Sequence, residues 1–540
     1  MAHPELHDPE TDPLATYVLE PDDVRTLLGR LAAGRGSATH TPVAPFTGAP
    51  IAAVPQSTAD DVAEAARRAR AAQRLWAATP LRQRIAVLLR AHDLLLTRQS
   101  DVLDLIQVET GKARVHAFEE VVDVADVARH YAARARRYLA DERVLGLIPG
   151  LTATRVVRHP VGVVGIVAPW NMPLNLPFGD ALPALVAGNA VLLRPDPQTT
   201  LTALWGAELL ADAGLPEDVL QVVAGGPEIG SAVVDHADAV IYTGSTRAGR
   251  EVAARAGARL VPTTLELGGK NGVYVADDVD VEVTARGLVR TCFAGVGQVC
   301  TTAERIYVHE AVFEEVLDAF VTRTQDLRLG AGLDYRSDLG SLTSAAQLAR
   351  VVEHVEDAVG QGATVLAGGE QRPDLGPYFY APTILADVPE HARCHREETF
   401  GPVVSVYPVA SDDEAVAAIN DTEYGLAAGV WTSDARRGRA IARRLRAGSV
   451  AVNEAYVAAW APIGAPQAGW GISGVGARHG REAIWASTRP QTIALQRGTH
   501  GIVGRHGPNL GLDRLFALGA DVWTPLYTGA LRAMRAARLP

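Results

Sequence analysis

The sequence predicts an α/β fold, because short apolar segments alternate with helical segments between residues 161 and 260. Four of these segments are rich in Val, Ile and Leu and end at Pro or Gly: 161–170, 190–196, 218–226 and 238–245. Strands without a polar face are typical of a parallel sheet that helices cover on both sides. Such sheets bind ligands at the carboxyl ends of their strands. We therefore expect one site where the four segments end.

The chain before residue 161 predicts helices. Residues 1–40 are expected to form a loosely held N-terminal arm that ends near Gly34 and Gly36. Beyond it, apolar residues recur at helical spacing. Three helical regions are expected: 60–76, 81–111 and 119–139.

The chain beyond residue 200 continues the alternation. Helices are expected at 201–214, 245–260, 279–294, 311–327, 411–420 and 433–446, and strands at 305–310, 403–409 and 449–455. The tail, residues 498–540, is weakly amphipathic. We expect it to dock on the protein itself or on a neighbouring subunit, with peripheral membrane contact as the alternative.

Composition narrows the class of protein. The 540 residues are enough for two or three domains. The net charge of −11 argues against general nucleic-acid binding, which needs basic surfaces. Three cysteines without a CxxC pair indicate neither a disulfide framework nor a zinc site, so no metal is expected. There is no signal-peptide pattern and no apolar segment long enough for a membrane span, so we expect a cytoplasmic protein.

Lysine is rare in this chain. Of the 51 basic residues, only Lys112 and Lys270 are lysines and the rest are arginines. Replacement of Lys by Arg within a motif therefore carries little information here. A retained lysine suggests a position at which arginine does not serve.

One turn has the pattern of a phosphate site. Gly244 to Gly249, with the sequence GSTRAG, follow a predicted strand and open a predicted helix. Backbone N–H groups at a helix N-terminus favour a phosphate, and Ser245 and Thr246 could add hydroxyl donors. The alternative is a tight turn capped by serine.

Four further residues suggest chemistry. Cys300 follows Gly295 and Gly297, in a loop that a substrate could reach, whereas Cys292 and Cys394 are expected to be buried and inert.

Glu266 lies between two leucines, where desolvation should raise its pKa towards neutrality, as a general base requires. The alternative is that Glu266 is a salt-bridged carboxylate. Asn171 follows the first strand and could donate to an oxyanion, or simply form a turn. Glu398 precedes Phe400 and could hold a ribose beside the aromatic ring.

Together these segments resemble the aldehyde dehydrogenase superfamily. APWN, TGST, LELGGKN, GQVC and EETFGPV occur in the order of the family, and Cys300 follows Glu266 by 34 residues, as the family pattern requires. The match extends from about residue 41 to 497. The resemblance implies an α/β fold of the aldehyde dehydrogenase type and an enzyme that binds NAD or NADP.

The resemblance also assigns roles. Cys300 would be the nucleophile, Glu266 would activate the water that hydrolyses a thioester, and Asn171 with the Cys300 amide would hold the oxyanion, with Lys270 supporting the Glu266 loop. Ser245 would contact the cofactor pyrophosphate, Glu398 the ribose, and Phe400 the nicotinamide. The full cofactor set would be Pro169, Trp170, Arg194, Asp196, Pro197, Gly225, Gly244, Ser245, Thr246, Gly249, Leu267, Glu398 and Phe400.

The domain arrangement follows from the same resemblance. It implies a Rossmann-type dinucleotide-binding domain (41–140 and 160–268), a catalytic domain (269–484) and an oligomerisation β-flap (141–159 and 485–497). The N-terminal arm (1–40) and the tail (498–540) lie outside these parts. Family members are homodimers or homotetramers, and the sequence does not choose between the two.

The cofactor and the substrate depend on departures from the family pattern. Pro197 replaces the glutamate that would hold the adenosine ribose, which permits NADP, whereas Asp196 argues the other way. We expect NADP to be used, with NAD left open as an additional cofactor. The chain most resembles a divergent branch of bacterial NADP-type succinate-semialdehyde dehydrogenases. However, Gly179 and Ala294 stand where a better-known branch has carboxylate-binding arginines. The branch resemblance makes succinate semialdehyde the first expectation for the substrate. The missing arginines make a broad, aromatic or medium-chain aldehyde the alternative. A cofactor-independent thiol esterase and a non-catalytic structural protein are remoter alternatives.

Overall fold

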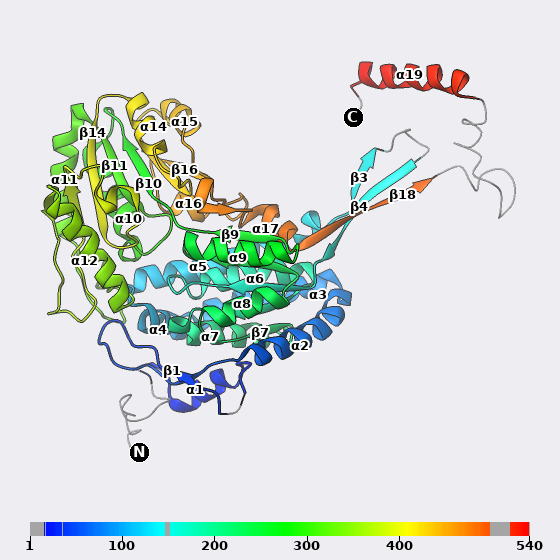
Figure 1. Cartoon of the computed structure of the whole chain (residues 1–540), viewed down its shortest axis with the longest axis horizontal. Coiled ribbons are helices and arrows are strands. Elements are labelled where there is room, and N and C mark those ends of the chain that lie inside the picture. Colours follow the sequence, from blue (N-terminus) through cyan, green and yellow to red (C-terminus); the bar gives the residue numbers. More distant parts are fainter. Residues whose placement is uncertain (1–15, 17, 35, 146–151, 497–518, 539–540) are drawn as a thin grey trace. The chain divides into compact units, whose positions relative to one another are not determined.

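The computed structural model describes residues 16, 18–34, 36–145, 152–496 and 519–538 and forms two compact units (Figure 1). Unit 1 comprises Met1–Ala135 and Val161–Ser487, and unit 2 comprises Arg136–Pro160 and Thr488–Pro540. Unit 1 contains both large sheets, so the division of 41–484 into a cofactor domain and a catalytic domain stays a prediction.

The first large sheet has six strands in the order β17-β9-β8-β5-β6-β7, and β17 alone is antiparallel to its neighbour. The strands are β5 (Val163–Val167), β6 (Ala190–Arg194), β7 (Leu220–Val222), β8 (Ala239–Thr243), β9 (Thr263–Glu266) and β17 (Gly474–Val475). Every residue of β5 and β6 is buried, as expected for strands covered on both faces. The order of the strands reverses between β5 and β8: the chain proceeds outward from β5 to β6 and β7, and then returns to form β8 on the other side of β5. Parallel sheets bind ligands where the strand order reverses.

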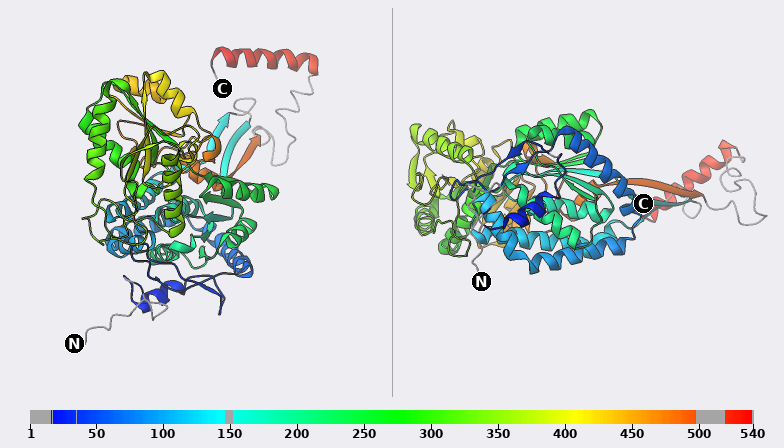
Figure 2. Two further views of the ribbon diagram at one scale, coloured as in Figure 1. Left: turned by 60° about the vertical axis from the view of Figure 1, so that its left-hand side comes forward. Right: turned by 90° about the horizontal axis from the view of Figure 1, so that it is seen from below.

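Helices cover both faces of this sheet (Figure 2). One face carries α2 (Ala59–Ala78), α8 (Pro227–His236) and α9 (Thr246–Ala258). The other carries α6 (Asn175–Ala187) and α7 (Thr200–Asp212), with α3 (Leu81–Thr97) and α4 (Gln99–Thr110) packed against them. The helical region predicted at 81–111 is therefore two helices. The apolar pattern hid the break at Arg98, because both helices turn an apolar face to the same core.

The second large sheet has seven strands in the order β12-β13-β14-β11-β10-β15-β16, with β12 antiparallel. The strands are β10 (Asn271–Val275), β11 (Ala303–His309), β12 (Thr364–Ala367), β13 (Thr383–Ala386), β14 (Val403–Val409), β15 (Ala427–Trp431) and β16 (Ser449–Val452). Its helices are α10 (Val281–Phe293), α11 (Phe313–Gln325), α12 (Ala345–Gly360), α13 (Arg393–Arg396), α14 (Asp412–Asn420), α15 (Ala435–Ala442) and α16 (Val457–Trp460). Helix α17 (Gly480–Ala486) instead packs against α6 of the first sheet. The predicted α/β fold class is confirmed.

The N-terminal segment is not a loose arm where it is described. Helix α1 (Pro21–Leu28) buries Val24 and Leu27, and Ala32 donates a backbone hydrogen bond of 2.9 Å to Val222 of β7. The expectation was wrong for residues 18–34 because an apolar stripe of three residues on a two-turn helix is a weak signal in sequence. A short ribbon of β1 (Thr39–His40) and β2 (Val54–Pro55) follows. Residues 1–15 lie outside the described residues.

Unit 2 contains an antiparallel sheet in the order β18-β4-β3. Its strands are β3 (Glu142–Leu145), β4 (Thr152–Pro160) and β18 (Thr488–Gln496), which fall at the predicted flap. The end of helix α5 (Arg114–Tyr138) and helix α19 (Ala520–Ala536) also belong to this unit. The tail before residue 519 lies outside the described residues, and among those described no helix is long and apolar enough to cross a membrane.

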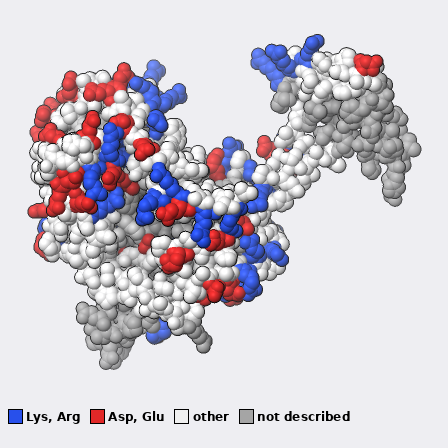
Figure 3. Space-filling model, viewed as in Figure 1, with Lys and Arg blue, Asp and Glu red and all other residues white. Residues whose placement is uncertain are grey.

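Charges of both signs are mixed over the face of unit 1 drawn in Figure 3. Acidic side chains gather over the part that carries α11 and α14, consistent with the net charge of −11.

Replacing Leu27 by Ala tests whether α1 is part of the folded core. Loss of a buried leucine side chain should lower the free energy of unfolding by about 2–5 kcal/mol. Thr26→Ala, on the exposed face of the same helix, should change it by less than about 0.5 kcal/mol. Denaturant unfolding followed by tryptophan fluorescence measures both, and equal stabilities of the two variants would contradict the packing of α1.

Candidate active site

A cavity of about 200 Å³ opens at the carboxyl ends of β5, β8 and β9. Its lining joins the predicted motifs: Pro169, Trp170, Asn171, Leu176, Thr243, Gly244, Ser245, Glu266, Leu267, Gly268, Cys300, Gln347, Arg350, Glu398 and Phe400. The predicted residues that do not line it are Arg194, Asp196, Pro197, Gly225, Thr246, Gly249 and Lys270. One cavity thus holds the thiol, the carboxyl and the amide that the sequence singled out.

Lys112 and Glu120 fix the turn that carries Asn171. The Lys112 ammonium lies 2.6 Å from Glu120 Oε1 and donates to the Asn171 carbonyl at 2.6 Å. Glu120 Oε2 accepts backbone N–H bonds from Leu174 and Asn175. The Asn171 amide donates to the Gln298 carbonyl at 2.9 Å. Because an amide NH₂ has two donors, one N–H of Asn171 has no partner among the described residues, and Asn171 lines the cavity.

The loop before Cys300 has an unusual backbone. Gly295, Val296 and Gly297 all have positive φ, and a Cβ on Gly297 would lie 2.1 Å from the Gly401 carbonyl oxygen. The glycine at 297 is needed for this close backbone contact, whereas the sequence suggested only access for a substrate. The contact joins the Cys300 loop to the segment that carries Glu398 and Phe400.

Asn271 holds the backbone on the other side of the cysteine. Its Nδ2 donates to the carbonyls of Cys300 at 2.7 Å and Thr302 at 2.8 Å, and its Oδ1 accepts from the Ala427 amide. The LELGGKN motif therefore fixes the GQVC motif directly. Sequence reasoning missed this residue because its partners are 29 or more positions away.

The three cysteines differ in environment as expected. Cys292 and Cys394 are buried, whereas Cys300 is partly exposed and lines the cavity. Burial raises the pKa of the Cys300 thiol to about 12, and the neighbouring Arg478 opposes that rise. The free protein therefore holds a protonated thiol at neutral pH, and the sulfur needs a base before it can act as a nucleophile.

Glu266 ends β9 and is 3% exposed. Its Oε1 is buried without a hydrogen-bond partner. Burial raises the pKa of Glu266 to about 8, and Arg478 opposes the shift. The sequence expectation that desolvation would bring this carboxyl near neutrality is confirmed, and a salt bridge on Oε1 is excluded.

Arg478 was not predicted from the sequence, although it affects both groups. It makes a two-point contact with Asp180, with both N–O distances 2.8 Å, and donates to Thr243 Oγ1 at 2.7 Å. Both partners are nearly fully buried. The pair brings α6, β8 and the turn after β17 together beside Cys300 and Glu266, and no motif in the sequence marks it.

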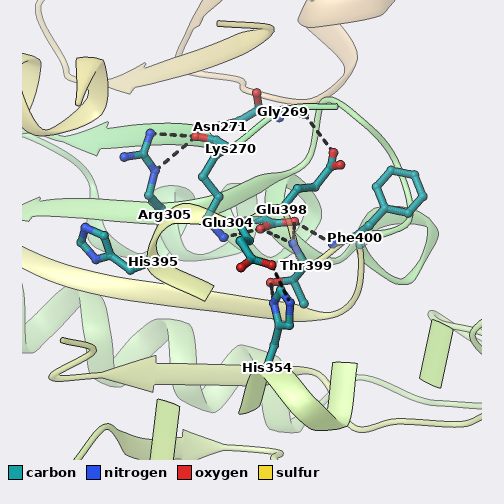
Figure 4. Close-up of polar contacts among 12 residues, drawn as sticks. Gly269, Lys270, Asn271, Glu304, Arg305, His354, His395, Glu398, Thr399 and Phe400 are labelled. Atoms are coloured by element: carbon teal, nitrogen blue, oxygen red, sulfur yellow. Dashed lines mark hydrogen bonds and ion pairs between the residues drawn. The ribbon is translucent and has the colours of Figure 1, made fainter. Parts of the chain in front are cut away.

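Lys270 lies outside the cavity and acts on the 398–400 segment (Figure 4). Its ammonium forms a buried ion pair with Glu304 of β11. Glu304 in turn accepts backbone N–H bonds from Thr399 at 2.9 Å and Phe400 at 2.9 Å. The described contacts of the Lys270 ammonium connect it to this segment, whereas the sequence suggested support for the Glu266 loop.

The same segment is held from α12 and from the LELGGKN turn. Gln347 donates to the Phe400 carbonyl at 2.7 Å, and Arg350 donates to the Glu398 carbonyl. The Glu398 carboxylate accepts from the Gly269 amide at 2.9 Å (Figure 4). Gln347 and Arg350 were missed in the sequence, where nothing distinguishes them from surface residues of a helix.

Two aromatic rings and a helix N-terminus complete the cavity. Trp170 and Phe400 meet edge to face, with ring centroids 5.6 Å apart. Ser245 caps α9 by accepting from the Ala248 amide at 3.3 Å, and it also lines the cavity. The Thr246 hydroxyl donates to the Ile472 carbonyl.

Gly249 serves packing. A Cβ at this position would lie 2.4 Å from Leu267, so glycine lets α9 approach the LELGGKN segment closely.

Arg194 and its neighbours lie at the end of β6. The Arg194 Nε donates to the Gly225 carbonyl at 2.8 Å, and Asp196 accepts from the Gln198 amide at 3.0 Å. Pro197 opens a short 3₁₀ turn there. Among the described residues, no acceptor bonds the two terminal nitrogens of Arg194.

The fold, with a cavity at the carboxyl ends of its parallel strands, is typical of an enzyme that binds a nucleotide. Residues 33–493 match the aldehyde dehydrogenase family, and the chain belongs to this family. A Mycolicibacterium smegmatis relative is 45% identical over 491 residues, covering 91% of this chain and 93% of its own. It is provisionally named a succinate-semialdehyde dehydrogenase [NADP(+)]. A Mycobacterium tuberculosis relative, provisionally named succinate-semialdehyde dehydrogenase [NADP(+)] 2, is 45% identical over 479 residues, covering 88% and 90%.

Solved structures agree with this assignment. An Escherichia coli NADP-dependent enzyme superposes with a TM-score of 0.82 at 30% identity, covering 86% of this chain and 96% of its own. An NAD⁺ complex of a Bacillus cereus aldehyde dehydrogenase gives 0.83 at 31% identity, covering 89% and 99%. The predicted family and fold are confirmed, and the predicted resemblance to relatives that carry the name succinate-semialdehyde dehydrogenase is found.

The raised pKa of Glu266 predicts how stability depends on pH. Between its ordinary value and about 8, the folded protein retains a proton that the unfolded chain has lost, so ionisation opposes folding. The stability that the folded protein gains by holding Glu266 protonated is complete at low pH and is lost as the pH rises towards 8. The free energy of unfolding of Glu266→Gln should therefore rise relative to wild type by about 3–5 kcal/mol from pH 5 to pH 8.

Glu251→Gln is the matched control, because Glu251 is exposed on α9. Its unfolding free energy should follow that of the wild type across this range. If Glu266→Gln also ran parallel to the wild type, the buried, proton-retaining state of Glu266 would be contradicted.

Proposed function

We propose that this protein oxidises an aldehyde to a carboxylic acid with NADP⁺, using Cys300 as the nucleophile. The observation that carries the proposal is one cavity lined by an accessible thiol, by the buried Glu266 carboxyl with an unbonded oxygen, and by the Asn171 amide. A nucleophile, a base and an oxyanion donor are the groups that oxidation through an acyl-enzyme requires.

The first step forms a bond between sulfur and carbon. The Cys300 thiol transfers its proton to a base as the sulfur adds to the carbonyl carbon. Glu266 lines the same cavity and has an unbonded oxygen, and its pKa of about 8 suits this exchange. The carbonyl oxygen becomes an alkoxide, which the free N–H of Asn171 and the Cys300 backbone amide stabilise.

The second half returns the enzyme to its starting state. When bound, the oxidised nicotinamide supplies the hydride acceptor that converts the hemithioacetal on Cys300 into a thioester. Glu266 releases the proton that it took from Cys300 to solvent and then removes a proton from a water molecule, whose oxygen attacks the thioester carbon. Asn171 stabilises the second oxyanion. Cleavage of the carbon–sulfur bond releases the carboxylic acid and a Cys300 thiolate, to which Glu266 returns the proton.

The residues of the cavity fit a nicotinamide nucleotide. Glu398, fixed by Gly269, would hold the ribose, and the edge-to-face pair of Trp170 and Phe400 would flank the nicotinamide. The N-terminus of α9 at Ser245 would receive the pyrophosphate. Gly244 and Leu267 complete this part of the lining.

The phosphate-bearing cofactor is favoured at the end of β6. Pro197 contributes no carboxylate that would repel a 2′-phosphate, and the Asp196 carboxylate is bonded to the Gln198 amide. The unbonded terminal nitrogens of Arg194 could bind a phosphate. The mycobacterial relatives carry NADP(+) in their names, in agreement with this proposal. NAD⁺ could also be used, since a Bacillus cereus neighbour is an NAD⁺ complex.

Succinate semialdehyde is the substrate in the names of the relatives and the first compound to test. A specific observation favours a second candidate. Gly179 and Ala294, which stand at the positions of the carboxylate-binding arginines of the better-known branch, are buried. The nearby Arg290 contacts Glu454, and its side chain is more than half exposed. A buried carboxylate without a cation is costly, so an aldehyde without a carboxylate fits the described lining better.

We further propose that the sheet of unit 2 serves oligomerisation.

Replacing Cys300 by Ser tests the function. The variant should lose NADP⁺-dependent aldehyde oxidation by at least about a thousandfold, because a hydroxyl is a far poorer nucleophile here. Cys292→Ser, in the same part of the chain but buried, should stay within about threefold of the wild type. Formation of the reduced nicotinamide is measured.

Two outcomes would contradict the proposal. Full activity of Cys300→Ser would remove the nucleophile from the mechanism. Hydrolysis of esters by the wild type, with no aldehyde oxidation in the presence of NADP⁺ or NAD⁺, would instead indicate a thiol esterase.

A further inference from the structure

A second, smaller cavity also reaches Cys300. It has a volume of about 30 Å³ and shares Asn171, Leu176 and Cys300 with the larger one. The rest of its lining is Asp123, Met172, Asn175, Val299, Thr301, Trp460, Gln467, Arg478 and His479. Because the nucleotide-type features lie in the larger cavity, the smaller cavity is the place for the far end of an aldehyde bound to Cys300.

Several polar groups in this lining are buried without a partner. They are both carboxyl oxygens of Asp123, Thr301 Oγ1, Trp460 Nε1 and His479 Nε2. Asp123 is 1% exposed. An unpaired polar group in a protein interior costs free energy, and native structures retain few of them. Four such side chains around one small cavity beside the nucleophile point to a polar ligand.

Asp123 differs from the acidic residues that precede it on α5. Glu119 accepts a hydrogen bond of 2.7 Å from the Tyr456 hydroxyl. Glu120 is paired with Lys112 and accepts two backbone N–H bonds. Asp123 lies one turn further along the helix and has no partner. Its carboxyl is therefore the acceptor on this helix that remains for a ligand.

The charges of the lining favour a donor over a carboxylate. Arg478 is the arginine of this lining, and its charge is balanced by Asp180, to which its Nε and Nη2 donate, while Nη2 also donates to Thr243. His479 is neutral, because burial lowers its pKa to about 3. The described lining thus offers the unpaired Asp123 carboxyl and one arginine that is already paired with a carboxylate. Burial raises the pKa of Asp123 to about 7, and a substrate carboxylate beside it would meet a like charge whenever Asp123 is ionised.

We propose that Asp123 is a specificity-determining residue that binds a hydrogen-bond donor, an ammonium or a hydroxyl group, at the end of the aldehyde remote from its carbonyl. This inference rests on the proposed aldehyde oxidation at Cys300. It assigns the enzyme to short aldehydes with an amino or hydroxyl terminus.

Four aldehydes that share the unit CH₂CH₂CHO test this proposal. They are 3-aminopropanal, 3-hydroxypropanal, butanal and succinate semialdehyde, whose far ends are an ammonium, a hydroxyl, a methyl and a carboxylate group. With NADP⁺, the wild type should show a kcat/KM for at least one of the first two that exceeds butanal by about tenfold or more. Succinate semialdehyde should be a poorer substrate than that compound.

The variant Asp123→Asn separates charge from shape. It should lower kcat/KM for 3-aminopropanal about tenfold, leave kcat/KM for butanal within about threefold, and raise kcat/KM for succinate semialdehyde. Asp123→Leu should lower kcat/KM for 3-aminopropanal and 3-hydroxypropanal and raise it for butanal. Asp126→Asn is the matched control, because it removes a carboxylate one turn away that contacts Arg129 and is partly exposed. In this control the kcat/KM for each of the four aldehydes should remain at the wild-type value.

The outcomes distinguish this proposal from the proposed function. A wild-type preference for succinate semialdehyde over both donor substrates would overturn it, as would an equal loss on all four compounds in Asp123→Asn. A change in relative kcat/KM is a readout that a merely structural role would not move, and thermal unfolding of each variant confirms folding. Inactivity of the wild type on all four compounds would overturn the proposed function, and this inference with it.

Discussion

The geometry of the site depends on two buried ion pairs between lysine and glutamate. Lys112 pairs with Glu120, which accepts the backbone N–H groups of the turn beside Asn171. Lys270 pairs with Glu304, which accepts those of the Phe400 segment. In each pair the carboxylate is the acceptor for a loop and the ammonium compensates its buried charge. Loss of one partner would leave an isolated charge in the interior, which is strongly destabilising.

The first of these pairs explains why lysine persists at position 112 in a chain that is rich in arginine. Lys112 Nζ lies between Glu120 Oε1, the Asn171 carbonyl and the Met172 sulfur. Three acceptors around one nitrogen suit a compact ammonium, whereas a guanidinium presents a planar fork. The Cys300 loop is held differently, by the Asn271 amide and by the contact of Gly297 with Gly401. All three loops are thus fixed by groups that do not touch the reacting atoms.

Much of the fold was predictable where the pattern was simple. The strands between residues 163 and 243 are continuous apolar runs, and a parallel sheet follows from them. Strand β10 was missed because it begins with Asn-Gly, both poor strand formers. Helix α6 was missed because it is apolar on every side and contains prolines, so it lacks an amphipathic period.

The same limit applies to the site. Asn171, Glu266, Cys300, Glu398 and Phe400 were found because local motifs carry them, and the structure brings them to one cavity. Glu304, Arg478 and Asp123 were not, because their significance depends on partners, or on the absence of partners, that only folding determines. A carboxylate in a helix has the same sequence pattern whether it is paired, solvated or directed into a cavity.

The most direct test of the account is a search for the acyl-enzyme in Glu266→Gln. The variant lacks the proposed base for Cys300, so the thioester should form more slowly after mixing with NADP⁺ and aldehyde, with water taking the thiol proton. The thioester should then accumulate, because no carboxyl activates the water that hydrolyses it. Intact-protein mass spectrometry should show one adduct per subunit, with the mass of the aldehyde less two hydrogen atoms, and peptide mapping should place it on Cys300. About one equivalent of reduced nicotinamide should accompany it. An adduct elsewhere, or steady turnover without an adduct, would contradict the account.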